Sequence, residues 1–180
     1  PHGVVRGSSV IAVHICRPPG LESEFTKKDY SSGKSGEATV VEVSPGHFLF
    51  VLLDNDQFNH LFFPKMLMSE AAPKLERLRD RRTVPRRDYP PFVTFTDPLV
   101  PTSVRAVDPD RLDAVFGPGY RLSSITVEIT DEPVTRRITA ILPWLLDPNV
   151  MRNPNWKGLP LSVRRAINDL YSGPIKSQNP

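Results

Sequence analysis

Cysteine and glycine are scarce in this chain, whereas proline is abundant. The single cysteine, Cys16, excludes an intramolecular disulfide and a zinc site built on several thiolates. Glycine occurs 10 times and proline 20 times among 180 residues, and the proline share is about twice the usual 5% or so. Because each proline removes a backbone donor and restricts φ, long helices and long central strands are disfavoured. Short elements joined by stiff loops are expected.

The chain also lacks any long apolar run. No stretch approaches the roughly 18 apolar residues that a membrane-spanning helix needs, and no charged segment precedes an apolar one in the manner of a secretion signal. Hydrophobic residues still make up 39% of the chain, which is enough to build a core. Length and composition together predict one domain that covers residues 1–180.

Alternating and periodic apolar residues predict an α+β fold with a mostly antiparallel sheet and several short helices. The polar stretch 17–36 indicates a loop, and residues 44–47 indicate the loop of a hairpin. The predicted strands are 4–16, 38–43, 48–53, 92–95, 103–107 and 120–130. The predicted helical segments are 58–70 with a break at Pro64, 74–82, 110–116, 133–142 and 160–172. The core is expected within about 4–147, with a C-terminal helical extension at about 148–172.

One segment differs from the rest of the chain in charge. Residues 74–87 carry seven positive and two negative side chains, so this segment is +5 while the remainder sums to −2. Two interpretations stay open: a solvated helix face that continues into a loop, or a contact surface for an anionic membrane or nucleic acid. Nucleic acid is disfavoured as the partner, because the run has no interleaved aromatic residue and the chain has no known nucleic-acid signature. The candidate binding residues are Arg79, Arg81, Arg82, Arg86 and Arg87.

The position of Pro85 divides these arginines into two groups. The first three are expected at the end of the predicted helix, where the helix dipole stabilises cations and gives them a structural role. Arg86 and Arg87 follow Pro85 on an extended loop and have no such explanation. They are therefore the stronger candidates for a contact.

Motifs for phosphate binding, metal binding and nucleophilic catalysis are absent or incomplete. Ser32-Gly33-Lys34-Ser35 resembles the end of a phosphate-binding loop, but Lys28 stands where that motif needs glycine. There is no G-x-S-x-G sequence and no pair of histidines at metal-ligand spacing. No catalytic residue, metal or cofactor is therefore assigned.

Two further features leave alternatives open. His47 or His60 together with Asp54 or Asp56 would suit a small hydrolase or ligand-binding enzyme, if the fold places an imidazole beside a carboxylate. Trp144 and Trp156 lie in proline-rich connections and are candidate binding residues. The alternative for each tryptophan is a plug at the end of a small core.

Several runs in the second half occur together in one family, and two runs in the first half match it more loosely. The runs are SVRAVDPD (103–110), FGPG (116–119), ITVEITDEPVT (125–135) and LPWL (142–145), with GSSVI (7–11) and GEA (36–38) in the first half. Over residues 3–147 the chain resembles an uncharacterised family of small bacterial envelope proteins.

The resemblance implies a periplasmic domain tethered to the inner membrane. The tether would be an N-terminal hydrophobic segment that, with one further strand, precedes Pro1. No activity, cofactor or catalytic residue comes with the resemblance. The leading hypothesis is therefore a non-enzymatic module that binds another protein or an envelope component.

Overall fold

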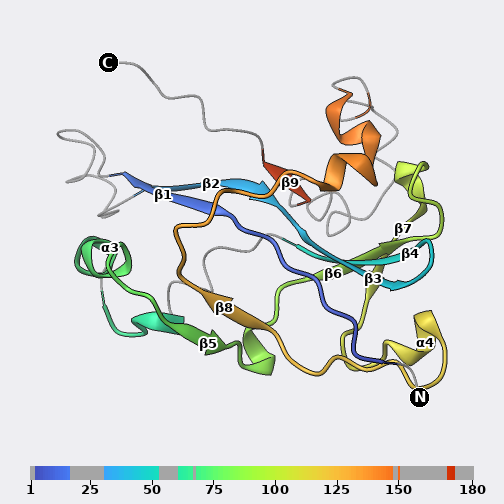
Figure 1. Ribbon diagram of the computed structural model, residues 1–180, viewed down its shortest axis with the longest axis horizontal. Coiled ribbons are helices and arrows are strands. Elements are labelled where there is room, and N and C mark those ends of the chain that lie inside the picture. Colours follow the sequence, from blue (N-terminus) through green and yellow to red (C-terminus); the bar gives the residue numbers. More distant parts are fainter. Residues whose placement is uncertain are drawn as a thin grey trace.

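The computed structural model describes residues 3–16, 31–52, 61–66, 68–147, 150 and 170–172 (Figure 1). The strands are β1 (Ala12–Cys16), β2 (Ser31–Glu37), β3 (Thr39–Ser44), β4 (His47–Val51), β5 (Arg81–Thr83), β6 (Phe92–Phe95), β7 (Val104–Val107), β8 (Thr126–Glu128) and β9 (Tyr171–Ser172). The helical elements include α3 (Met68–Leu75), α4 (Asp113–Phe116) and the 3-10 helices η1 (Arg86–Asp88), η2 (Pro101–Ser103), η3 (Ile138–Ala140) and η4 (Pro143–Leu146). Within these residues, no helix has the length and apolar character to cross a bilayer.

The strands form antiparallel sheets, as the pattern predicts. The strand orders are β1-β2-β9, β3-β4-β6-β7 and β5-β8, and every strand pair in the described part of the chain is antiparallel. The predicted hairpin is confirmed, with a shorter turn: Ser44 pairs with His47, so only Pro45 and Gly46 remain between the strands. Gly46 has φ of 76°, a conformation that favours glycine.

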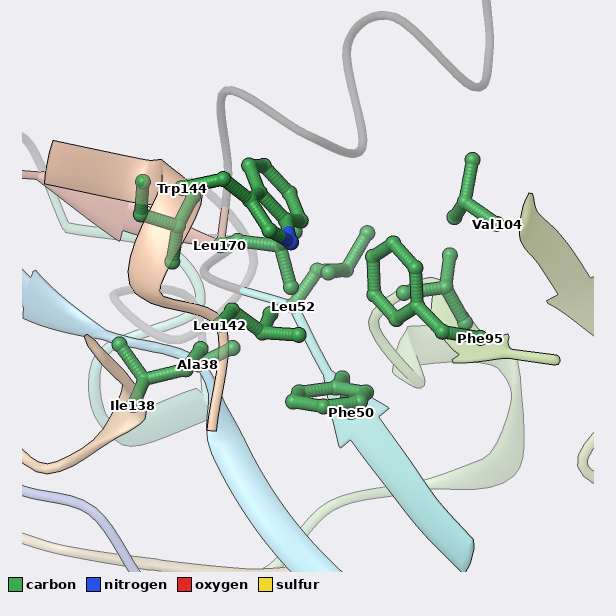
Figure 2. Packing of buried hydrophobic residues seen from close by; sticks show 11 residues of the cluster. Ala38, Phe50, Leu52, Phe95, Val104, Ile138, Leu142, Trp144 and Leu170 are labelled. Atoms are coloured by element: carbon green, nitrogen blue, oxygen red, sulfur yellow. The ribbon is translucent and has the colours of Figure 1, made fainter. Parts of the chain in front are cut away.

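The four-stranded sheet is buried on both faces. On one face the rings of Phe50 and Phe95 pack edge to face, with their centres 5.4 Å apart. The ring centres of Phe95 and Trp144 are 5.7 Å apart. Figure 2 shows this cluster, in which η3 and η4 bring Ile138 and Trp144 against the sheet. A second cluster lies on the other face, around Phe92, whereas the next residue of β6, Val93, belongs to the first cluster. Because side chains alternate along a strand, adjacent residues of β6 enter different clusters, and all four residues of this strand are buried.

Near the N-terminus the structure corrects two predicted elements. The predicted loop 17–36 is wrong for residues 31–36, which belong to β2 and pair with β1. The predicted strand 4–16 shortens to β1, and residues 3–11 lie outside the sheets. A polar segment becomes a strand when a neighbour supplies its main-chain hydrogen bonds, and composition does not reveal that neighbour.

The predicted helix 74–82 is also wrong. Helix α3 ends at Leu75, and residues 81–83 form β5. Strand β5 pairs with β8, so Arg81 lies opposite Glu128. The cross-strand pairing of opposite charges favours the strand over a helix whose apolar stripe is thin.

The predicted helix 133–142 is wrong: residues 133–137 are not helical, and only the short 3-10 helix η3 lies within this range. Its stripe residues Ile138 and Leu142 are still completely buried. The backbone before η3 forms hydrogen bonds with residues 3–11, the N-terminal segment. Thr135 N–H donates to the Val10 carbonyl at 3.1 Å, and Val10 N–H donates to Thr135 Oγ1 at 3.0 Å. These bonds hold the chain before η3 against the N-terminal segment.

Other predicted elements change in extent. The strand 120–130 shortens to β8, the helix 110–116 shortens to α4, and residues 171–172 at the end of the predicted helix 160–172 form β9. Leu170 lies in a turn, and residues 160–169 lie outside the described residues. Residues 63–66 form a turn around Pro64 before α3 begins, which agrees with the predicted break.

Candidate ligand-binding site

The five candidate arginines of the basic run are engaged with carboxylates and carbonyls. Arg79 forms an ion pair with Asp131 and donates to the carbonyls of Glu76 at 3.0 Å and Leu78 at 2.7 Å. Arg81 Nε donates to Glu128 Oε2 at 2.8 Å across the β5–β8 pair. Both guanidinium groups therefore hold β5 and its approach to the chain around β8.

Arg82, the next residue of β5, contacts a different part of the chain. Its Nε donates to Asp80 Oδ2 at 2.9 Å, and its Nη1 donates to the Leu61 carbonyl at 3.0 Å. The guanidinium also lies 5.3 Å from the centre of the Phe62 ring, within cation–π range. Arg82 thus links β5 to residues 61–62, which lie before the turn that precedes α3.

Arg86 forms the most complete pair of the run. Its Nε and Nη2 donate to the two carboxylate oxygens of Asp110 at 2.8 and 2.6 Å, and its guanidinium lies 5.2 Å from the Tyr89 ring centre. The hydrogen bond from Arg86 lowers the pKa of Asp110, and the same bond raises the pKa of Arg86. Arg87 is different, because its side chain is 83% exposed and its Nε lies 3.6 Å from Asp88 Oδ2.

The five candidate arginines are therefore not a set of free cations on one face. They lie on β5, on its approach and on η1. The first three do not leave a helix end as predicted, and the last two lie in a short 3-10 helix and not on an extended loop. Each has a carboxylate partner, and four of them connect segments that lie apart in the sequence. These contacts give the run a role within the fold.

The predicted tryptophan and histidine sites are also placed. Trp144 is buried, and its Nε1–H donates to the Pro98 carbonyl at 2.8 Å, which is the geometry of a core plug. His47 is exposed in the hairpin, and its Nδ1 lies 3.1 Å from the Pro45 carbonyl oxygen. Within the described residues, no three histidine, cysteine, aspartate or glutamate side chains gather as a metal site would need. The other predicted members, His60, Asp54, Asp56 and Trp156, lie outside the described residues.

A different site lies where three distant segments meet. The N-terminal segment runs beside β3, and the chain before η3 runs beside the N-terminal segment (Figure 1). Ser9 Oγ and Thr39 Oγ1 are 2.6 Å apart, and the Thr135 N–H bond to Val10 described above joins the third segment. Glu37, at the end of β2, also bonds to the third segment, through the Ile138 N–H.

Two glycines allow the segments to approach so closely. A side-chain carbon at Gly7 would lie 2.1 Å from the Val40 carbonyl oxygen. At Gly36, φ is +144° and a side-chain carbon would lie 2.8 Å from Ile11 Cγ2. Any larger residue at either position would push the N-terminal segment away from the sheet.

Glu37 is a buried carboxylate whose two oxygens differ in their partners. The residue is only 3% exposed, and its Oε2 accepts a hydrogen bond from the Ile138 N–H at 2.7 Å, across 101 positions of sequence. Its Oε1 has no hydrogen-bond donor within the described residues. Because a buried carboxylate is costly without full hydrogen bonding, the second oxygen marks a place where a ligand donor would be stabilised.

Glu37 forms part of the wall of a groove of about 360 Å³, a volume at the lower end of small-molecule sites. The charged residues of the wall are Arg6, Glu37, Glu42 and Arg137, and the apolar ones are Val40, Phe48, Ile138 and Ile141. Among the described residues, neither arginine has an ion-pair partner, in contrast to the five candidate arginines of the basic run. The groove thus combines cations, a buried acceptor and an apolar surface.

Sequence reasoning does not find this site. Glu37 follows a polar stretch whose composition predicts a loop, and Arg6 and Arg137 are isolated charges far apart in the chain. Comparison of the chain with protein-family models, curated proteins and solved structures gives no match.

Proposed function

We propose that this chain is a non-enzymatic binding module, with the groove around Glu37 as its ligand site. The observation that carries the proposal is a carboxylate that is 3% exposed and whose Oε1 has no donor among the described residues. It lies in the wall of a groove that also contains Arg6 and Arg137. Neither arginine has an ion-pair partner among the described residues. A carboxylate needed only to bind the Ile138 N–H would not require cations on the same groove. A binding role also agrees with the position of His47, which meets no described carboxylate.

On this proposal the partner is a small polar component of the cell envelope. The resemblance to a family of envelope proteins supports a periplasmic location, with a tether to the inner membrane, for a single α+β domain. Reporter fusions to the full-length gene product test the location. Periplasmic alkaline phosphatase activity is expected at the C-terminus, and activity confined to a cytoplasmic reporter would contradict it.

Saturation-transfer NMR on the 180-residue chain tests the site. Mixtures of amino acids, carboxylic acids, amines, sugars and nucleotides are added to the wild type, to Arg137→Glu and to the control Arg105→Glu. Arg105 is an exposed arginine on β7, at the opposite edge of the four-stranded sheet from β3. At least one compound class is expected to bind the wild type and the control but not Arg137→Glu. Binding that survives in Arg137→Glu, or no binding to the wild type, would reject the groove as the ligand site.

A further inference from the structure

We infer that the ligand of the Glu37 groove is a small zwitterion with an ammonium group, a carboxylate and an apolar side chain, as in an aliphatic amino acid or a short peptide. This inference rests on the proposed function and adds the chemical class of the ligand. It follows from the charges on the groove wall, from the Oε1 of Glu37 that lacks a described donor, and from the apolar residues between them.

The charges of the wall favour a ligand that carries both signs. Two arginines, Arg6 and Arg137, and two glutamates, Glu37 and Glu42, line the groove, so their formal charges cancel. A purely anionic ligand would be attracted by the guanidinium groups but repelled by the carboxylates, and a purely cationic ligand would meet the reverse. A zwitterion places each of its charges against the opposite one, which makes both interactions favourable.

The hydrogen-bonding groups assign the two ends of the ligand. Glu37 Oε1 only accepts hydrogen bonds when the carboxylate is ionised, so it suits the N–H donors of an ammonium group. Glu42 Oε1 already accepts the Gly46 N–H at 3.1 Å and is exposed, which leaves Glu37 as the buried acceptor. The guanidinium groups of Arg6 and Arg137 only donate, and their planar geometry suits a carboxylate.

The remaining wall suits an aliphatic side chain. Val40, Phe48 and Ile141 are half-buried and line the groove, and they pack at the margin of the main core. Covering this surface removes apolar area from water and favours binding. A groove of about 360 Å³ accommodates one amino acid or a dipeptide.

Isothermal titration calorimetry with three matched probes tests the inference on the intact chain. L-leucine carries both charges, 3-methylbutylamine lacks the carboxylate, and 4-methylpentanoate lacks the ammonium group. We expect saturable binding of L-leucine and at least tenfold weaker binding of both analogues. Equal affinity for 4-methylpentanoate and L-leucine, or no binding of L-leucine at millimolar concentration, would overturn the zwitterion assignment.

Variants separate the roles of the two ends. Glu37→Gln keeps an oxygen acceptor for the Ile138 N–H but removes the charge, and Arg137→Ala removes a cation from an exposed position. Each is expected to weaken L-leucine binding at least tenfold, while the control Arg105→Ala leaves it unchanged. Circular dichroism checks that each variant is folded, and Arg137→Ala alone decides the matter if Glu37→Gln is unfolded. Unchanged affinity in Arg137→Ala would reject the inference.

The NMR screen distinguishes this failure from failure of the proposed function. If sugars or acids bind the wild type and are lost in Arg137→Glu while zwitterions never bind, the groove remains the ligand site and only the ligand class is wrong. If no class depends on Arg137, both the site and the ligand class are rejected.

Discussion

Truncation of Ile138 is expected to destabilise the protein strongly although the residue lies in a short 3-10 turn. Ile138 is completely buried, and its N–H is bound by Glu37. It packs in the cluster that includes Leu142 and Leu170, which are also completely buried (Figure 2). Because the neighbours are tied to different parts of the chain, the space left by a smaller side chain is not easily refilled.

The expected magnitudes follow from this burial. Ile138→Val removes one methyl group and should cost about 0.5–1.5 kcal/mol, whereas Ile138→Ala should cost about 2–5 kcal/mol. For a chain of this size, about 2–4 °C of Tm per kcal/mol gives a decrease of roughly 4–20 °C for the alanine variant. Ile138→Asp places a second carboxylate beside that of Glu37 in the core, and the cost is comparable with a total stability of about 5–15 kcal/mol. We therefore expect Ile138→Asp to be unfolded.

Thermal and urea unfolding followed by circular dichroism measures the series. The control is Ala140→Asp, an exposed position in the same turn, which should change stability by no more than about 0.5 kcal/mol. The order Val, Ala, Asp should hold with an unchanged urea m-value for the folded variants. An alanine variant as stable as the wild type, or a folded aspartate variant with an unchanged Tm, would refute the burial of η3 against the sheet.

Three further changes test other contacts. Trp144→Phe keeps an aromatic ring in the core but removes the donor to the Pro98 carbonyl, so the free energy of unfolding should fall by about 1–3 kcal/mol in urea melts, and no change would contradict that hydrogen bond. Arg86 lowers the pKa of Asp110. The ionised carboxylate therefore stabilises the fold at pH values above the ordinary pKa of aspartate, and this stabilisation is lost as the pH falls through the lowered pKa. Asp110→Asn should therefore lower Tm at pH 7 by an amount that shrinks in acid, and a pH-independent difference would count against the pair. Gly36→Ala should cost about 1–3 kcal/mol by thermal melting, since φ is +144°, and unaltered stability would show that the backbone there is not strained.

Local patterns in the sequence are sufficient for several elements. The hairpin of β3 and β4 follows from alternating apolar residues around Pro45-Gly46, because period-two alternation and a positive-φ glycine are properties of neighbouring residues. Strands β6 and β7 are predictable from short apolar runs bounded by prolines. The alternation around β8 is also informative, since Ile125, Val127 and Ile129 are half-buried while the residues between them are exposed.

Tertiary contacts decided the elements and the site that the sequence did not reveal. Strand β2 exists because β1 supplies hydrogen bonds to a polar segment, and β5 exists because its register places Arg81 opposite Glu128. The bond between Glu37 and Ile138 joins positions 101 residues apart, and no periodic pattern links them. The groove therefore depends on how the chain closes its long loops, because charge pairing and close backbone approach arise only between segments that folding has brought together.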